Sequence, residues 1–533
     1  MSQDVETAAA EDAAAAPRRG MRGSPRWTLL AAALGVMMVG VDGTIVAVAN
    51  PDIQSKLGAS LADIQWVTNG YLLALAVTLI TVGKFGDRFG HKKVFLTGIV
   101  GFAATSAGVG LSGSLGKSIS LVITFRILQG LFGAMLQPTA LALLRNTFPA
   151  EKLNSAIGIW GAVIGASTAA GPIVGGLLVQ HINWEACFYV NIPVGLIALA
   201  LGLTALKETP PSKVHSFDVP GIALLSAFLF LLVWSLIKAP DYGWGSGKSI
   251  GFFVGCVAAL VLFVVRESTA KEPLLPLRLF RSISLSAGTV LVLALMFSMF
   301  GAMFFMTFYM ENVHGLDAID TGVRLLPLTG MLIVGSPLSG FAITKFGPRM
   351  PMVVGMLLAS GALFGLSRIT LTSSLNETIL YFAMLGLGLS PVIVGATEVI
   401  VGNAEVELAG VASGLQSTAM QVGGTIGTAV LGAVMSAKVG TLLPERWTAA
   451  HLPALTPAQL AEVKSATTVG VAPVASGTSA QTAATIAEVT HSTFISGMSA
   501  SFLVAGFVAI GGALIALLTK KGVNDTEGAV AMH

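Results

Sequence analysis

Two side chains of opposite charge lie inside long apolar stretches of the sequence. Asp42 belongs to VDGTIVAVANP (41–51), and Arg126 belongs to FRILQGLFGAMLQP (125–138). Each lies about eight positions from the outer end of its predicted span, roughly 12 Å deep at 1.5 Å per residue, so they would meet if their helices are neighbours. A buried ionisable group is a functional candidate, and Asp42 could carry a proton, because burial favours its neutral form and a cation its charged form. The alternative is a permanent ion pair that only fixes helix packing.

Small and polar residues follow both charges. Gln129, Gly130 and Gly133 follow Arg126 at helical spacing, so one face of that helix is polar or small. For the two glycines, close packing against another helix is the simpler interpretation.

A proline interrupts the apolar run at 154–180. Pro172 cannot donate a backbone hydrogen bond, so it frees a carbonyl and bends the helix. Glycines that would let a neighbouring helix approach lie at Gly158, Gly171, Gly175 and Gly176. Generic packing explains scattered glycines, but it explains this spacing less well.

A charged segment, GKFGDRFGHKK (83–93), separates two apolar runs and predicts a tight hairpin at a membrane face. Its candidate functional residues are Gly83, Asp87, Arg88, Gly90 and Lys92. The pattern returns in weaker form as GFAITKFGPR (340–349). The chain therefore consists of two related halves, a repeat typical of alternating-access transporters.

The composition places the chain in a membrane. Of its 533 residues, 54% are hydrophobic and 11% are charged, and long uncharged runs of this kind predict membrane-spanning helices. Runs long enough to span a bilayer lie near 28–49, 64–82, 94–114, 119–143, 154–180, 187–206, 219–237, 250–265, 284–309, 325–344, 350–367, 379–401, 409–435 and 493–518. The distribution of lysine and arginine predicts that both termini are cytoplasmic.

The spacing of the repeat predicts the domain organisation. The two charged segments follow the second and tenth runs, so two helices are inserted between two six-helix halves. The expected division is a cytoplasmic tail at 1–26, a first half at 27–206, a linker with two inserted helices at 207–266, a second half at 267–518 and a cytoplasmic tail at 519–533. Within the outer segment 437–490 we expect one short helix at 456–463, with the rest mobile.

Other classes of site are not indicated. GWGSGKS (243–249) resembles a phosphate-binding loop, but Tyr242 stands where that motif needs glycine, and no strand precedes it. Cys187 and Cys256 lie in different apolar runs and predict neither a disulfide framework nor a metal site. We expect no cofactor, metal, nucleotide or nucleic-acid partner.

Taken together, these segments resemble the major facilitator superfamily, and more narrowly its fourteen-helix drug:proton antiporter family. The loop motif is similar at Gly83, Asp87, Arg88, Gly90 and Lys92, although His91 stands where arginine is usual. The first-helix, fourth-helix and exporter motifs are similar at Asp42, Thr44, Ala49, Pro51, Arg126, Gln129, Gly130, Gly133, Gly158, Gly171, Pro172, Gly175 and Gly176, with Asn50 and Ser167 as departures. The resemblance covers roughly 27–436.

The resemblance implies a proton-coupled exporter of lipophilic, often cationic drugs in a bacterial plasma membrane. It implies a central cavity lined by spans 1, 4, 9 and 12, proton coupling at Asp42 and Arg126, and a conformational latch at 83–93. Cavity candidates are Thr44, Gln129, Met296, Phe300, Met303 and Phe304. The last four belong to a Met- and Phe-rich stretch that suits varied lipophilic molecules, although a lipid-facing span needs no such role. Glu398 is either a second proton or cation site or an interfacial residue.

Two other functions stay open. One is dedicated export of an endogenous metabolite, such as a self-made antibiotic or siderophore. The other is nutrient uptake or lipid translocation, and the Gly171–Pro172 pattern argues against uptake. The expected partners are a small lipophilic substrate, protons driven by the proton motive force and the lipid bilayer, and the expected state is a monomer.

Overall fold

The computed structural model describes residues 22–113, 117–208, 218–270, 273–403, 409–474 and 478–520. These residues form helices and short connections, with no β-strand among them. The first half contains α2 (Pro25–Leu57), α3 (Leu61–Phe89), α4 (His91–Leu111), α5 (Ile119–Ala134), α6 (Leu136–Thr147), α7 (Ala150–His181), α8 (Ala186–Tyr189) and α9 (Asn191–Ala205). Beyond it lie α10 (Val219–Tyr242), α11 (Gly247–Thr269), η2 (Leu277–Arg281), α12 (Ile283–Phe308), η3 (Tyr309–Val313), α13 (Ala318–Phe346), α14 (Arg349–Leu366), α15 (Leu375–Gly402), α16 (Ala409–Ala449), α17 (Pro457–Thr468) and α18 (Ala480–Ala516).

Every apolar run predicted from the sequence coincides with a helix or with two consecutive helices. In the described part of the chain, 12 helical segments are long and apolar enough to span a membrane. Helices α3 and α7, which hold the second and fifth predicted runs, are not among the 12. The all-α, multi-pass architecture is thus confirmed, while the count of fourteen crossings stays a prediction for these two helices.

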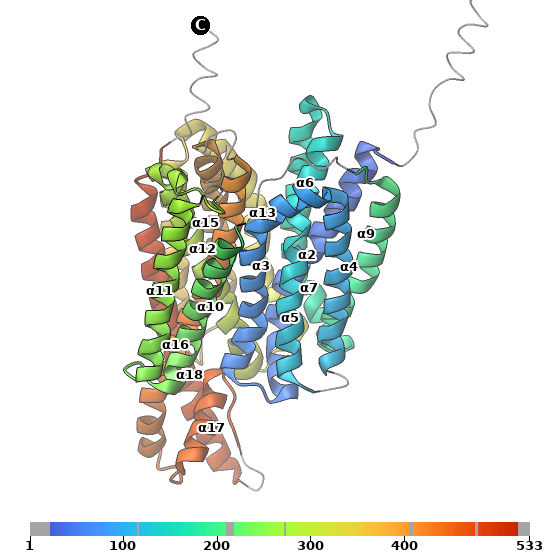
Figure 1. The fold of residues 1–533 in the computed structure, drawn as a ribbon. Coiled ribbons are helices and arrows are strands. Elements are labelled where there is room, and N and C mark those ends of the chain that lie inside the picture. Colours follow the sequence, from blue (N-terminus) through green and yellow to red (C-terminus); the bar gives the residue numbers. More distant parts are fainter. Residues whose placement is uncertain are drawn as a thin grey trace, which may run out of the picture.

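The helices form two bundles that lie side by side (Figure 1). Helices α2 to α9 make one bundle, and α12 to α18 make the other. The bundles meet where α3 packs on α16 and where α7 packs on α13. The division of the chain at 207–266 stays a prediction, and part of that segment lies outside the described residues.

The inserted pair, α10 and α11, covers one of the two seams between the bundles. Helix α10 packs on both α3 and α16. The Trp66 ring of α3 lies 5.8 Å from the rings of both Phe230 and Trp234 of α10, measured between centroids. The buried side chain of Val233 belongs to the same apolar cluster as Ala429 of α16. The pair therefore adds an apolar layer over the seam.

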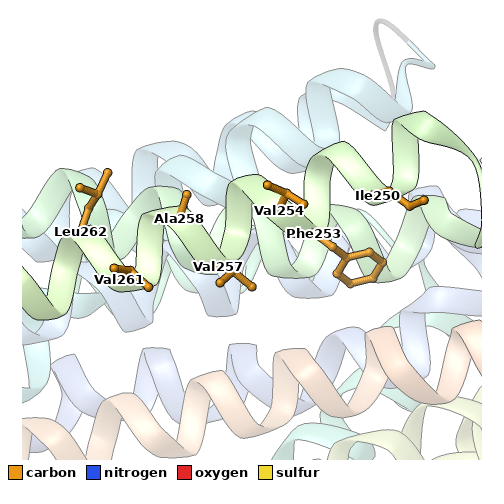
Figure 2. Close-up of a pocket in the computed structure, with 7 residues that line it drawn as sticks. All are labelled: Ile250, Phe253, Val254, Val257, Ala258, Val261 and Leu262. Atoms are coloured by element: carbon orange, nitrogen blue, oxygen red, sulfur yellow. The ribbon is translucent and has the colours of Figure 1, made fainter.

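Helix α11 contacts α10 and turns its other face outward. Figure 2 shows a shallow apolar groove on that face, formed by Ile250, Phe253, Val254, Val257, Ala258, Val261 and Leu262. Val254 and Val257 are 62% and 60% exposed. A membrane-spanning helix with such a face suits contact with lipid chains, so the groove by itself indicates no substrate site.

The segment 83–93 is more helical than a hairpin loop. Helix α3 continues through Phe89, and the whole change of direction takes place at Gly90, whose φ is 92°. The repeated segment has the same form, because α13 ends at Phe346 and Gly347 has a φ of 72°. The predicted relationship between the halves is confirmed at this turn, and the predicted loop was wrong because the charged residues extend the helix instead of interrupting it.

The outer segment 437–490 is also largely helical. The predicted short helix is present as α17, with Thr456 as N-cap, a capping box with Gln459 and Pro457 in the first turn. Contrary to the prediction of a single helix there, α16 continues to Ala449 and α18 begins at Ala480. These extensions and α17 project from one end of the second bundle (Figure 1).

Candidate functional site

The two buried charges meet inside the first bundle. Arg126 Nη1 lies 2.5 Å from Asp42 Oδ2. Asp42 is 0% exposed and Arg126 is 1% exposed. The charges come from α2 and α5, as their similar depth predicted. A buried pair of this kind is retained only where further hydrogen bonds satisfy the remaining polar atoms.

Two amides complete the surroundings of the Asp42 carboxylate. Gln129 Nε2 donates to Asp42 Oδ1 at 2.8 Å, and Gln129 Oε1 accepts from Arg126 Nη1 at 2.7 Å. Asn191 Nδ2 donates to the same Oδ1 at 3.2 Å and to Ser106 Oγ at 3.0 Å. The carboxylate is therefore held by one amide from α5 and one from α9 as well as by the arginine.

Arg126 is held by the backbone and by two aromatic rings. Its Nε donates to the carbonyl of Val67 at 3.2 Å. Its guanidinium carbon lies 4.1 Å from the centre of the Tyr71 ring and 5.6 Å from that of Phe188. Cation–π contact of this kind stabilises a desolvated guanidinium by about 2 kcal/mol. The cation thus has a fixed position when Asp42 is charged.

A small cavity lies against this network, between the two bundles. Its wall includes Arg126 and Tyr71 from the first bundle and Phe300, Met303 and Phe304 from α12. The remaining lining residues are Gly43, Val46, Ala47, Asn50, Thr68, Leu72 and Thr428. Its volume of about 20 Å³ is enough for one water molecule. The space between the bundles is therefore nearly closed at this level.

The cavity wall contains polar atoms that have no hydrogen-bond partner within the described structure. They are Asn50 Oδ1, Thr68 Oγ1 and the hydroxyl of Tyr71. A buried polar atom without a partner is destabilising by about 1–3 kcal/mol. These three atoms are consequently available to water or to a bound molecule when the cavity opens.

The predicted cavity residues lie in different places. Phe300, Met303 and Phe304 line the cavity, and Gln129 contacts Asp42 next to it. Met296 is buried one turn further along α12 and is not a lining residue. Thr44 is also outside the lining. The lining residues belong to α2, α3, α5, α12 and α16. The ninth predicted span, α12, therefore lines the cavity as expected, whereas the twelfth, α15, does not.

Thr44 instead joins α2 to α7. A proline at position 172 cannot bond to the carbonyl four residues earlier, which is that of Thr168. Thr44 Oγ1 donates to this carbonyl at 3.0 Å. The carbonyl that the sequence predicted to be free thus receives its hydrogen bond from a neighbouring helix.

The glycines around Pro172 bring α7 close to helices of both bundles. A Cβ at Gly171 would collide with the Thr44 hydroxyl, and one at Gly175 would press on Ile45 of α2. A Cβ at Gly176 would collide with the backbone of Ala318 in α13. The motif therefore serves two interfaces at once. Gly158 lies in α7, but its surroundings fall outside the described residues.

The predicted latch residues lie around the Gly90 turn. Lys92 Nζ donates to the carbonyl of Leu206 at 2.7 Å, at the end of α9. The Arg88 guanidinium lies 5.5 Å from the centre of the Phe89 ring. The side chain of Asp87 and the surroundings of Gly83 fall outside the described residues. The structure thus shows Lys92 holding two helix ends of one bundle together.

Contacts between the bundles concentrate at the end that carries α17. Gln65 Nε2 of α3 donates to the carbonyl of Thr428 in α16 at 2.7 Å. Gln180 Nε2 of α7 donates to Asp317 Oδ2, next to α13, at 2.9 Å. With the Gly176–Ala318 approach, these contacts form what we call the outer seal, because this end carries the segment 437–490 that the sequence predicts to lie outside the cell.

Several residues of this site were not predicted from the sequence. Asn191 and Ser106 complete the Asp42 network, and Tyr71 stacks on Arg126. A polar residue at position 191 interrupts an apolar segment, and this interruption was the sequence feature that could have identified Asn191 as a site residue. Glu398, a predicted candidate, lies half-buried on α15, a helix that contributes nothing to the cavity lining among the described residues.

Comparisons with known proteins agree on one family. The profile of the Major Facilitator Superfamily matches residues 32–428. The chain is 57% identical over 510 residues to the tetracenomycin C resistance and export protein of Streptomyces glaucescens, covering 96% of this chain and 94% of that protein. It is 30% identical to the multidrug efflux pump LfrA of Mycolicibacterium smegmatis, covering 92% and 95% of the two chains.

Solved structures show the same fold. A bacterial homologue of the human lysosomal transporter Spinster, in an inward-facing and unoccupied conformation, aligns with a TM-score of 0.62 and 18% identity. The alignment covers 92% of this chain and 98% of that one.

Proposed function

Because the chain belongs to the Major Facilitator Superfamily and is a drug efflux transporter, we propose that it exchanges its substrate for protons across a bacterial plasma membrane. The observation that carries this proposal is the ion pair of Asp42 with Arg126, because Arg126 also forms part of the cavity wall. One side chain contacts both the group that would hold the proton and the space that would hold the substrate.

The charges explain how proton and substrate would exclude each other. With Asp42 charged, the pair is neutral, and the cavity can accept a lipophilic cation against Phe300, Met303 and Phe304. A proton on Asp42 removes the counter-ion of Arg126 and leaves a net positive charge at the cavity wall. That charge repels a cationic substrate, so proton uptake favours substrate release.

The driving force is sufficient for useful export. One elementary charge moving through 100 mV is worth about 2.3 kcal/mol, and one pH unit is worth about 1.4 kcal/mol. For an uncharged substrate, one proton per cycle would therefore support accumulation outside the cell by more than a hundredfold, because each 1.4 kcal/mol is a factor of ten. For a monovalent cation the two charge movements cancel, and the pH term alone supports about tenfold per pH unit.

The proposed orientation places both termini and the turns at Gly90 and Gly347 in the cytoplasm. It follows from the excess of lysine and arginine in the segments on that side. In this orientation the outer seal is closed, and Gly83, Asp87, Arg88, Gly90 and Lys92 form a cytoplasmic latch. The transporter would work as a monomer, because the proposed exchange uses residues of one chain.

The substrate we propose to test first is tetracenomycin C, the compound named for the 57% identical relative. This relative favours a second function, the dedicated export of one antibiotic, over a broad drug range. Efflux from energised vesicles separates the two: a multidrug exporter should move both ethidium and tetracenomycin C, whereas a dedicated exporter should move the second compound only.

The coupling proposal is tested by the pH change that substrate addition causes in proteoliposomes. Asp42→Asn keeps the shape of the side chain and removes its titration, so substrate-induced proton release and uphill efflux should both disappear. Glu377→Gln, at an exposed position, is the control and should keep both, whereas Glu398→Gln tests the second proton-binding candidate from the sequence. Wild-type proton exchange in the Asp42→Asn protein would move the coupling site elsewhere.

A further inference from the structure

A second carboxylate lies partly buried at the outer seal. Glu311 belongs to η3 (Tyr309–Val313), a π-helical turn that continues α12. Its Oε1 atom is buried and has no hydrogen-bond partner in the described structure. Glu311 was not predicted from the sequence, because the apolar run before it was expected to end at 309.

Among the described residues, no lysine or arginine forms an ion pair with Glu311. The hydroxyl of Thr321, in α13, lies beside the carboxylate, and Thr321 is 0% exposed. Thr321 Oγ1 also lacks a hydrogen-bond partner within the described residues. A carboxylate oxygen that is buried without a partner is incompletely satisfied. The single proton of the Thr321 hydroxyl can be donated to only one carboxylate oxygen, and a proton on Glu311 would supply a further donor and remove the charge.

Acidic groups from both bundles act on Glu311. Asp52 comes from α2 in the first bundle, and Asp317 precedes α13 in the second. Asp52 pairs with Lys56 at 2.9 Å, and Asp317 accepts the hydrogen bond from Gln180 that closes the seal. Closing the seal therefore brings a carboxylate of one bundle towards two carboxylates of the other, and like charges in such a place oppose closure.

The nearby histidines do not neutralise this negative charge near neutral pH. The ring of His314 packs on Tyr309 with 4.6 Å between centroids. Burial and the charge of Arg324, from α13, lower the pKa of His314 below its ordinary value. His491, from α18, is close enough to His314 to interact with its charge. Near neutral pH, at which a carboxylate is ordinarily charged, His314 is therefore neutral.

We propose that Glu311 is a proton-binding site of the outer seal, which takes a proton from the outer solution while the seal is open and is covered in its neutral form when the seal closes. The inference rests on the proposed proton-coupled exchange and assigns a place to proton entry. The proton neutralises Glu311, reduces its repulsion from Asp52 and Asp317, and allows the carboxyl to leave water. Acid on the outer side then favours closure.

The test measures seal closure directly. Spin labels are placed at Ser55 and Thr441, two exposed outer positions on opposite bundles, in the full chain with Cys187 and Cys256 replaced by alanine and reconstituted in nanodiscs. Distances between the labels are recorded by pulsed electron paramagnetic resonance from pH 5 to 9. In the wild type, the ratio of closed to open molecules should rise as pH falls, by up to about tenfold per pH unit near the midpoint.

Glu311→Gln should keep the seal mostly closed over the whole range and reduce the pH dependence to less than about twofold per unit. Glu311→Asp should retain a titration, and Asp52→Asn should shift the midpoint to higher pH by weakening the repulsion. His314→Gln and Glu377→Gln, an exposed outer carboxylate, are controls that should keep the wild-type dependence. A Glu311→Gln protein with the wild-type pH dependence, or a His314→Gln protein without it, would overturn the proposal.

A separate measurement distinguishes this inference from the proposed function. If substrate-induced proton release depends on Asp42 while Glu311→Gln leaves seal closure unchanged, the coupling proposal stands and the Glu311 site fails. If the wild type exchanges no protons with substrate, the coupling proposal itself fails, whatever the labels report.

Discussion

The two bundles share a framework but differ in the chemistry they place at the centre. Both turn on a glycine with positive φ, Gly90 and Gly347, after helices that end in Arg88–Phe89 and Lys345–Phe346. In each pair the cation lies over the neighbouring ring, at 5.5 and 5.4 Å from its centre. Near the cavity, however, the first bundle contributes a buried ion pair, and the second contributes phenylalanine and methionine.

The contacts at the helix ends are alike in the two bundles. Lys92 donates to the last carbonyls of α9, and Arg349, its counterpart, donates to the carbonyl of Leu517 at the end of α18. Packing, turns and the cations at the helix ends thus follow the repeat, while the buried charges beside the cavity do not. The comparison teaches that, at the cavity, the first bundle supplies the buried charges and the second supplies an adaptable apolar wall.

The largest expected effect comes from removing the buried cation. Arg126→Ala leaves the Asp42 charge without its partner, which should destabilise the protein by about 3–5 kcal/mol and abolish substrate-induced proton exchange in proteoliposomes. Adding Asp42→Asn should recover part of the stability, measured by thermal unfolding in detergent, but none of the exchange. Phe304→Leu is the matched change in the second bundle and should alter substrate preference while leaving proton exchange intact. Loss of exchange in Phe304→Leu would break the proposed division.

An intermediate effect is expected at the two turns. An alanine at either position would have to take a strained backbone conformation, which lowers the free energy of unfolding by about 1–3 kcal/mol. Gly90→Ala should lower the melting temperature more than Gly347→Ala, because a Cβ at Gly90 would also collide with the carboxylate of Glu208, whereas Gly347 has open space there. Gly243→Ala, with a φ of 85° and equally open space, is the control for strain alone. Equal losses at Gly90 and Gly347 would show that the Glu208 contact contributes nothing.

The smallest effect is expected from the two cations at the helix ends. Lys92→Met and Arg349→Met each remove a partly exposed hydrogen bond to helix-terminal carbonyls, a contribution of about 0.3–1 kcal/mol. Both should lower the melting temperature by a similar small amount, and both losses should shrink in high salt. Lys93→Met, at an exposed position, should change neither stability nor its salt dependence. A loss confined to Lys92→Met would mean that the symmetry of these contacts has no energetic counterpart.

Local signals in the sequence predicted much of this arrangement. The depth of Asp42 and Arg126 in their runs predicted their contact, and Pro172 predicted a carbonyl without a helical partner. The donor to that carbonyl, Thr44, could not be identified, because it depends on which helix packs against α7. Asn191 and Ser106 escaped for the same reason, since their partners come from other helices. The outer parts of α16 and α18 escaped because Ala- and Thr-rich segments outside the membrane lack a hydrophobic signal.

The position of Arg126 between Asp42 and the cavity has a thermodynamic consequence. Two ligands that compete through one side chain share a single coupling free energy, and that energy is the same whichever ligand is varied. The factor by which bound substrate weakens proton binding must equal the factor by which a bound proton weakens substrate binding. Titrating substrate affinity against pH and counting protons displaced per substrate are therefore two measurements of one quantity.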